Sequence, residues 1–121
     1  MTDAASVSAL VDAELSRISD KNVSNIIRSL MVTPRVEDRG WDYGAEDQRY
    51  PCWIVMEHHQ SNTAIAYCEY GFGPKCPWGL LFISGPHMGI GMDAAWYLRL
   101  EDAFRESMAW EGENPHGYEV R

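Results

Sequence analysis

The stretch Ile65-Ala-Tyr-Cys-Glu-Tyr-Gly-Phe-Gly-Pro-Lys-Cys-Pro-Trp-Gly-Leu-Leu-Phe-Ile-Ser84 sets large rings beside glycine, proline and cysteine. It belongs to a longer segment, residues 41–82, which holds nine of the chain's fourteen aromatic residues and all three cysteines. Rings in such a setting indicate short twisted strands and rigid loops with much buried aromatic surface. This segment therefore predicts the sheet around which the rest of the fold is built.

Three strands are predicted in and before this segment. Residues 50–59 and 63–70 have the alternation of strands and are separated by a turn at 60–62. Residues 78–84 supply the third strand. Because the connections are short, we expect an antiparallel meander and not parallel crossovers. The charged residues 35–49 predict a short edge strand or an ordered loop.

The alternation also predicts which side chains share a face of the sheet. Along residues 50–59 it places Trp53, Val55 and Glu57 on one face, with Cys52, Ile54 and Met56 on the other. In the charged segment, Trp41 and Tyr43 have strand spacing and are expected to turn inward.

Helices are predicted on either side of the strands. Residues 3–19 and 23–31 carry apolar residues at helical spacing and form two helices or one kinked helix, which Pro34 ends. A last helix is expected over Ala94–Trp110, with Asp93 as its N-cap. The class is α+β: an N-terminal helix or helix pair, a three- to four-stranded antiparallel meander and a C-terminal helix packed on the sheet. Residues 1–121 are predicted to form one domain.

The charge balance limits the kinds of partner. The chain has 18 acidic and 10 basic residues, a formal net charge of −8 and a pI near 4.8. Such a surface repels phosphate backbones and anionic lipids, which argues against nucleic-acid and membrane binding. It suits a basic protein partner, although acidic charge also serves solubility alone. The absence of a signal-like start and the odd number of cysteines predict a cytoplasmic protein with reduced thiols.

No motif indicates a metal, a cofactor or a catalytic residue. The best trio for a metal is Cys68, Cys76 and His87, but no cysteine pair has zinc-finger spacing. A nucleophilic role for Cys76 would need a nearby histidine or a helix N-terminus, and its surroundings match neither the thioredoxin-type C-x-x-C nor the papain-type pattern. The glycine-rich stretch 85–91 has neither phosphate-binding spacing nor a following lysine. We therefore predict no metal and no cofactor, and a binding protein in preference to an enzyme.

The aromatic residues exceed what a small core needs, so some are expected at an interface, where rings give contact area at small entropic cost. Trp53 and Trp96 are assigned to the core, whereas Trp41, Trp78 and Trp110 are the better interface candidates. The predicted function is a small acidic protein-binding module, for example an immunity or inhibitor protein that neutralises a basic toxin or enzyme. Its predicted partner-binding residues are Asp38, Trp41, Asp42, Tyr43, Glu46, Asp47, Trp78, Glu101 and Asp102.

Two alternatives remain open. The first is a small-molecule-binding protein or hydrolase with a pocket between the sheet and the last helix. That pocket would be lined by Glu57, His58, Glu69 and His87, in which paired carboxylates could divide acid and base roles. The second is a homodimer formed through a sheet edge or an aromatic patch.

Overall fold

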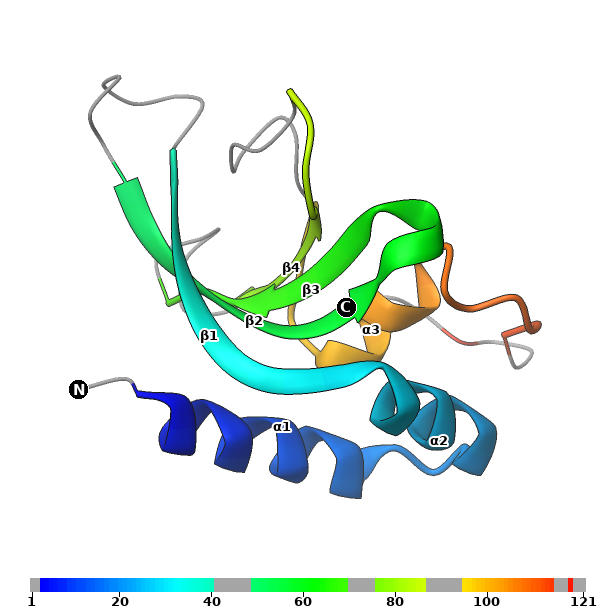
Figure 1. Ribbon diagram of the computed structural model, residues 1–121. Coiled ribbons are helices and arrows are strands. Elements are labelled where there is room, and N and C mark those ends of the chain that lie inside the picture. Colours follow the sequence, from blue (N-terminus) through cyan, green and yellow to red (C-terminus); the bar gives the residue numbers. More distant parts are fainter. Residues whose placement is uncertain (1–2, 41–48, 70–75, 87–94, 115–117, 119–121) are drawn as a thin grey trace.

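The computed structural model describes residues 3–40, 49–69, 76–86, 95–114 and 118. Two helices come first, five strands follow, and a short helix comes last, which confirms the predicted α+β class (Figure 1). The elements are α1 (Ala4–Arg17), α2 (Lys21–Leu30), β1 (Met31–Gly40), β2 (Arg49–His58), the short 3₁₀ helix η1 (His59–Ser61), β3 (Thr63–Tyr67), β4 (Trp78–Phe82), β5 (Ala95–Tyr97) and α3 (Leu100–Arg105).

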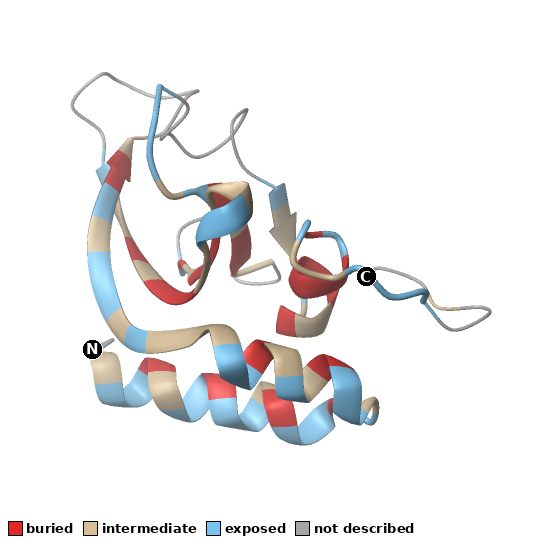
Figure 2. Cartoon of the chain, turned by 45° about the vertical axis from the view of Figure 1, so that its right-hand side comes forward, coloured by how far each residue is buried: buried red, intermediate tan, exposed pale blue. Residues whose placement is uncertain are grey.

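The N-terminal helical region consists of two separate helices because each has its own N-cap. Asp3 and Ser6 form a capping box at the start of α1, and each satisfies the backbone N–H of the other. The carboxylate of Asp20 accepts hydrogen bonds from the first turn of α2. Each helix buries one side and leaves the other in solvent, as the alternating colours of Figure 2 show. The helical period in the sequence is confirmed for both.

The five strands lie in sequence order, β1-β2-β3-β4-β5, and every neighbouring pair is antiparallel. The predicted meander is confirmed, with one or two strands more than expected. Strand β1 starts directly after α2 and runs through Pro34. Proline is tolerated there because β1 lies at an edge of the described sheet, where an N–H facing away from β2 needs no partner strand.

The pairing of β2 with β3 contains a bulge that changes the predicted facing of side chains. Ile54 pairs with Ala66, but Met56 pairs with Ile65, so Val55 is an extra residue in β2. As a result Val55 and Met56 both pack on the helix-covered face of the sheet. Glu57 lies opposite Ala64 and so belongs to the other face. The prediction that Glu57 shares a face with Trp53 is therefore wrong.

The predicted helix over residues 94–110 is also wrong at both ends, since α3 ends at Arg105. Residues 95–97 form β5, which pairs with β4, and α3 begins only at Leu100. The aromatic side chains of Trp96 and Tyr97 suit a strand better than a helix, and an available edge of β4 decides between the two. The predicted N-cap Asp93 lies outside the described residues.

Apolar side chains pack on both faces of the sheet. The helix-covered face holds the larger core, in which α1, α2 and α3 pack on β2 and β3; its members include Val7, Val11, Val23, Ile27, Val55, Met56, Ile65, Leu100 and Phe104. The second face holds a smaller cluster of Cys52, Ile54, Ala64, Ala66, Cys68 and Leu81. The small residues of this second cluster let the sheet bend strongly, as Figure 1 shows for β1 and β2.

Candidate functional site

One residue of each strand lies in register in a line that crosses the whole sheet. Val36 pairs with Trp53, Trp53 with Tyr67, Tyr67 with Trp78, and Trp78 with Tyr97. We call the four rings, Trp53, Tyr67, Trp78 and Tyr97, the aromatic row. Neighbouring rings on paired strands stabilise each other, and those of Tyr67 and Trp78 meet edge to face with centroids 5.3 Å apart.

The aromatic row lies partly under the helices and partly in solvent. Trp78 is buried at 3% exposure, whereas Trp53, Tyr67 and Tyr97 are half-buried against the main core. At the β1 end of the row, Val36 is 48% exposed. The half-buried rings therefore offer apolar surface that packing against the main core holds in place.

Carboxylates lie close to the phenol groups of the aromatic row. Burial raises the pKa of Tyr67, and the nearby charge of Glu69 raises it further. Burial likewise raises the pKa of Tyr97, with additional contributions from Glu106 and Asp102. Glu69 and Glu106 are both exposed. Exposed acids beside half-buried rings attract a cation, both by charge and through the negative faces of the rings.

Asp38 is the member of the predicted acidic surface on β1 that the structure describes. It is exposed and lies two residues beyond Val36, hence on the same face of the sheet as the aromatic row. The other predicted residues of that surface, Trp41, Asp42, Tyr43, Glu46 and Asp47, lie outside the described residues.

Trp78 and the acidic residues predicted on the last helix are not at the surface as expected. Trp78 belongs to the core. Asp102 is fully buried and accepts hydrogen bonds from the Arg99 guanidinium, at 2.6 and 3.0 Å, and from the Tyr118 hydroxyl. Glu101 accepts a 2.9 Å hydrogen bond from Arg105, which is itself buried. These acids have structural partners within the chain, because α3 turns them toward the protein and not toward solvent.

Those residues of the alternative pocket that the structure describes do not converge. Glu57 forms a 2.9 Å ion pair with Arg35, which lowers the pKa of Glu57, on the sheet face opposite α3. The ring of His58 bonds the Ser61 hydroxyl at 2.6 Å through Nδ1. Glu69 lies beyond the far end of β3, and His87 lies outside the described residues. The space between the sheet and α3 is filled by the buried side chains Leu100, Ala103 and Phe104.

The structure describes only two residues of the trio considered for a metal. Cys68 is buried in the second cluster, Cys76 is half-buried, and His87 lies outside the described residues. Among the residues that the structure describes, no group of three or more His, Cys, Asp and Glu side chains could hold a metal ion.

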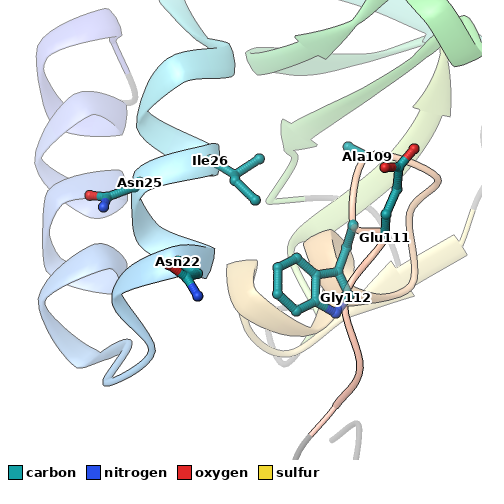
Figure 3. A pocket seen from close by; sticks show the side chains of 7 residues that line it. Asn22, Asn25, Ile26, Ala109, Glu111 and Gly112 are labelled. Carbon is teal, nitrogen blue, oxygen red and sulfur yellow. The ribbon is translucent and has the colours of Figure 1, made fainter.

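A groove of about 410 Å³ lies between α2 and the segment that follows α3. Figure 3 shows Ile26 pointing from α2 into the gap, with Ala109, Glu111 and Gly112 on the opposite side. Trp110, which also lines the groove, is held by a tilted ring contact with Phe104 and a hydrogen bond to Asn114. Trp110 is half-buried in the wall of this groove, and its predicted place in an interface stays a prediction.

Comparisons of the chain with protein-family models, with curated proteins and with solved structures find no match. Within the described ranges, no helix has the length and apolar character needed to cross a membrane. A half-buried aromatic strip with exposed carboxylates beside it is a candidate protein-binding surface.

The sequence singled out Trp78 of the aromatic row but missed the other members. Trp53 was assigned to the core, and Tyr67, Tyr97 and Val36 were not singled out. Their spacing along the chain carries no sign of their alignment, which depends on the register of four strand pairs. Trp53 and Tyr67 lie on either side of the turn predicted at residues 60–62, so the position of that turn could have suggested that these two residues pair.

Proposed function

We propose that the chain is a small acidic protein-binding module that captures a basic protein, in the manner of an inhibitor or immunity protein. The observation that carries this proposal is the aromatic row with Asp38, Glu69 and Glu106 around it. Rings held rigidly by a core lose little side-chain entropy when a partner covers them. The carboxylates, together with the net charge of −8, would draw a basic partner in and orient it.

The roles of the two groups differ. Exposed rim charges mainly change the association rate and its salt dependence, because they act before contact and remain partly hydrated. Half-buried rings mainly change the dissociation rate, because they lose their contact with water only in the complex. An enzyme whose active-site surface is basic fits both requirements, and covering that surface would inhibit it.

The test starts from an affinity capture of the tagged protein from its native lysate at low and high salt, read by mass spectrometry. A partner captured by the aromatic row should be basic, should bind stoichiometrically and should dissociate as salt rises. The decisive comparison uses the charge reversals Glu69→Lys and Glu106→Lys against the control Asp12→Lys. Asp12 is also exposed but lies on the outer side of α1.

Each reversal beside the row should weaken binding about tenfold at low salt, and the control should change it far less. Equal binding by all three variants would reject the row as the binding surface, even if a partner is captured.

A further inference from the structure

Cys52 and Cys68 lie directly opposite each other on neighbouring strands. Trp53 pairs with Tyr67, so the next pair in the antiparallel register joins Cys52 of β2 to Cys68, the residue after β3. The backbone N–H of Cys68 donates a 2.8 Å hydrogen bond to the carbonyl oxygen of Pro77, on the β4 side. Because the N–H of Cys68 points away from β2, the two cysteines form a non-hydrogen-bonded pair.

This type of pair has the geometry that a disulfide requires. Residues in a non-hydrogen-bonded antiparallel pair have Cα atoms about 4.5 Å apart, and their side chains approach more closely than in the alternative pair. Disulfides span Cα separations of about 4.4–6.8 Å. Both thiols belong to the cluster on the second face of the sheet, and a hydrogen bond joins them. Neither cysteine is in a disulfide in this structure.

We infer that Cys52 and Cys68 are an oxidisable dithiol, which a low-molecular-weight disulfide such as oxidised glutathione converts into a cross-strand disulfide between β2 and β3. One thiolate attacks the oxidant, forms a mixed disulfide and releases one glutathione thiol. The second cysteine then attacks the mixed disulfide and releases the other. Two electrons pass from the cysteine pair to the oxidant, and the two thiol protons leave with the glutathione products.

The folded sheet protects this dithiol from rapid reaction. Both cysteines have 0% exposure, and the hydrogen bond with Cys68 and burial raise the pKa of the Cys52 thiol. A thiol with a raised pKa contains little of the reactive thiolate. The reaction therefore proceeds through openings of the sheet at the end of β3, and its rate follows their frequency. The half-buried Cys76 should react first.

The disulfide would fasten β2 to β3 at the end of the hairpin opposite η1. It closes a loop of moderate length, so it restricts the unfolded chain and stabilises the folded one. We expect the melting temperature of the oxidised protein to exceed that of the reduced protein by about 10 °C. The increase should vanish on addition of a reductant.

The experiment uses the full chain with Cys76→Ser, so that only the pair can react. The protein is incubated with oxidised glutathione, remaining thiols are alkylated under denaturing conditions, and the chain is digested with trypsin. Both cysteines then lie on one peptide, Tyr50–Lys75. Further cleavage after Glu57 and Glu69 separates Cys52 from Cys68 unless a disulfide joins the two fragments.

Joined fragments, a mass lower by two hydrogen atoms and a raised melting temperature are the expected result. The matched control Cys52→Ser, in the same background, should give only a mixed disulfide or an unmodified Cys68. Fragments that separate after oxidation of the Cys76→Ser protein, whether free or each joined to glutathione, would overturn the inference. Since the mapping is done on a protein with both cysteines intact, it does not depend on the folding of the control.

Discussion

The Arg39 guanidinium on β1 donates a 2.9 Å hydrogen bond from Nη1 to the carbonyl oxygen of Phe82 on β4, although β2 and β3 lie between these strands in the sheet. Arg39 is 4% exposed, and its Nε and Nη2 donate to the carboxylate of Glu37. A flat sheet would keep β1 and β4 far apart. The bend that brings them together encloses the second apolar cluster and fixes how β1 presents Val36 and Asp38.

We expect Arg39→Ala to lower the free energy of unfolding by about 2 kcal/mol, because it removes a buried guanidinium that joins the Phe82 carbonyl to Glu37, although Glu37 keeps its ion pair with Arg35. The matched control is Arg17→Ala, which removes an exposed ion pair with Glu14 and should cost about 0.5 kcal/mol or less. Urea unfolding followed by tryptophan fluorescence measures both. Equal losses in the two variants would mean that the Arg39 contact does not hold the bend.

Gly79 permits the packing of Trp96 on β4. The two residues pair directly, and a Cβ on Gly79 would lie 2.6 Å from the Trp96 ring. Gly79→Ala must therefore displace the ring, and we expect a loss of about 2 kcal/mol in the free energy of unfolding. Gly40→Ala is the control, since a Cβ there meets only Arg49 at 3.7 Å, and it should change stability by about 0.5 kcal/mol or less. A harmless Gly79→Ala would contradict the close approach.

Most of the fold could be predicted from periodicity, and the failures have physical causes. The helical spacing of α1 and α2 was visible because each helix packs one apolar side. Residues 95–97 have an equally good helical spacing with α3, but their hydrogen bonds go to β4. Whether these residues form a strand or a helix depends on the edge of β4, which is distant in sequence. The local pattern of apolar residues carries no information about that edge.

The candidate site was harder to predict because facing depends on register. The extra residue Val55 reverses the alternation of side chains along β2. Glu57 therefore lies on the face of the sheet opposite to that of Trp53, and not on the same face as predicted. Asp38 is exposed on the edge strand β1, and its predicted place in a partner-binding surface stays a prediction. Asp102 was misplaced because an acid in an amphipathic helix normally faces solvent, whereas this one meets Arg99 and Tyr118 inside the protein.

The tyrosines predict how stability changes at alkaline pH. Burial and the hydrogen bond to Asp102 raise the pKa of Tyr118 above its ordinary value of 10.0. Since the folded state favours the neutral phenol, this contribution to stability is complete below about pH 10 and is lost as pH rises further. We expect unfolding midpoints to fall above pH 10, and less steeply in Tyr118→Phe. Some fall should remain in that variant, because the pKa values of Tyr67 and Tyr97 are raised in the same direction. Identical slopes in the two proteins would contradict the assignment.

Asp102 and Glu106 lie four residues apart, and we expect their variants to separate stability from binding. Asp102→Asn removes the charge that two Arg99 nitrogens contact inside the protein, and it should lower the free energy of unfolding by about 2–3 kcal/mol. Glu106→Gln changes an exposed carboxylate and should alter stability by about 0.5 kcal/mol or less.

Binding should show the opposite order. Glu106→Gln removes a charge beside the aromatic row and should slow association with a basic partner at low salt, while folded Asp102→Asn protein should associate nearly as fast as the unaltered chain. Stopped-flow association rates and urea unfolding, measured on the same preparations, give both quantities. If Asp102→Asn instead slowed association while leaving stability unchanged, the acid would act at the surface, and the buried contact with Arg99 would not be the role of this residue.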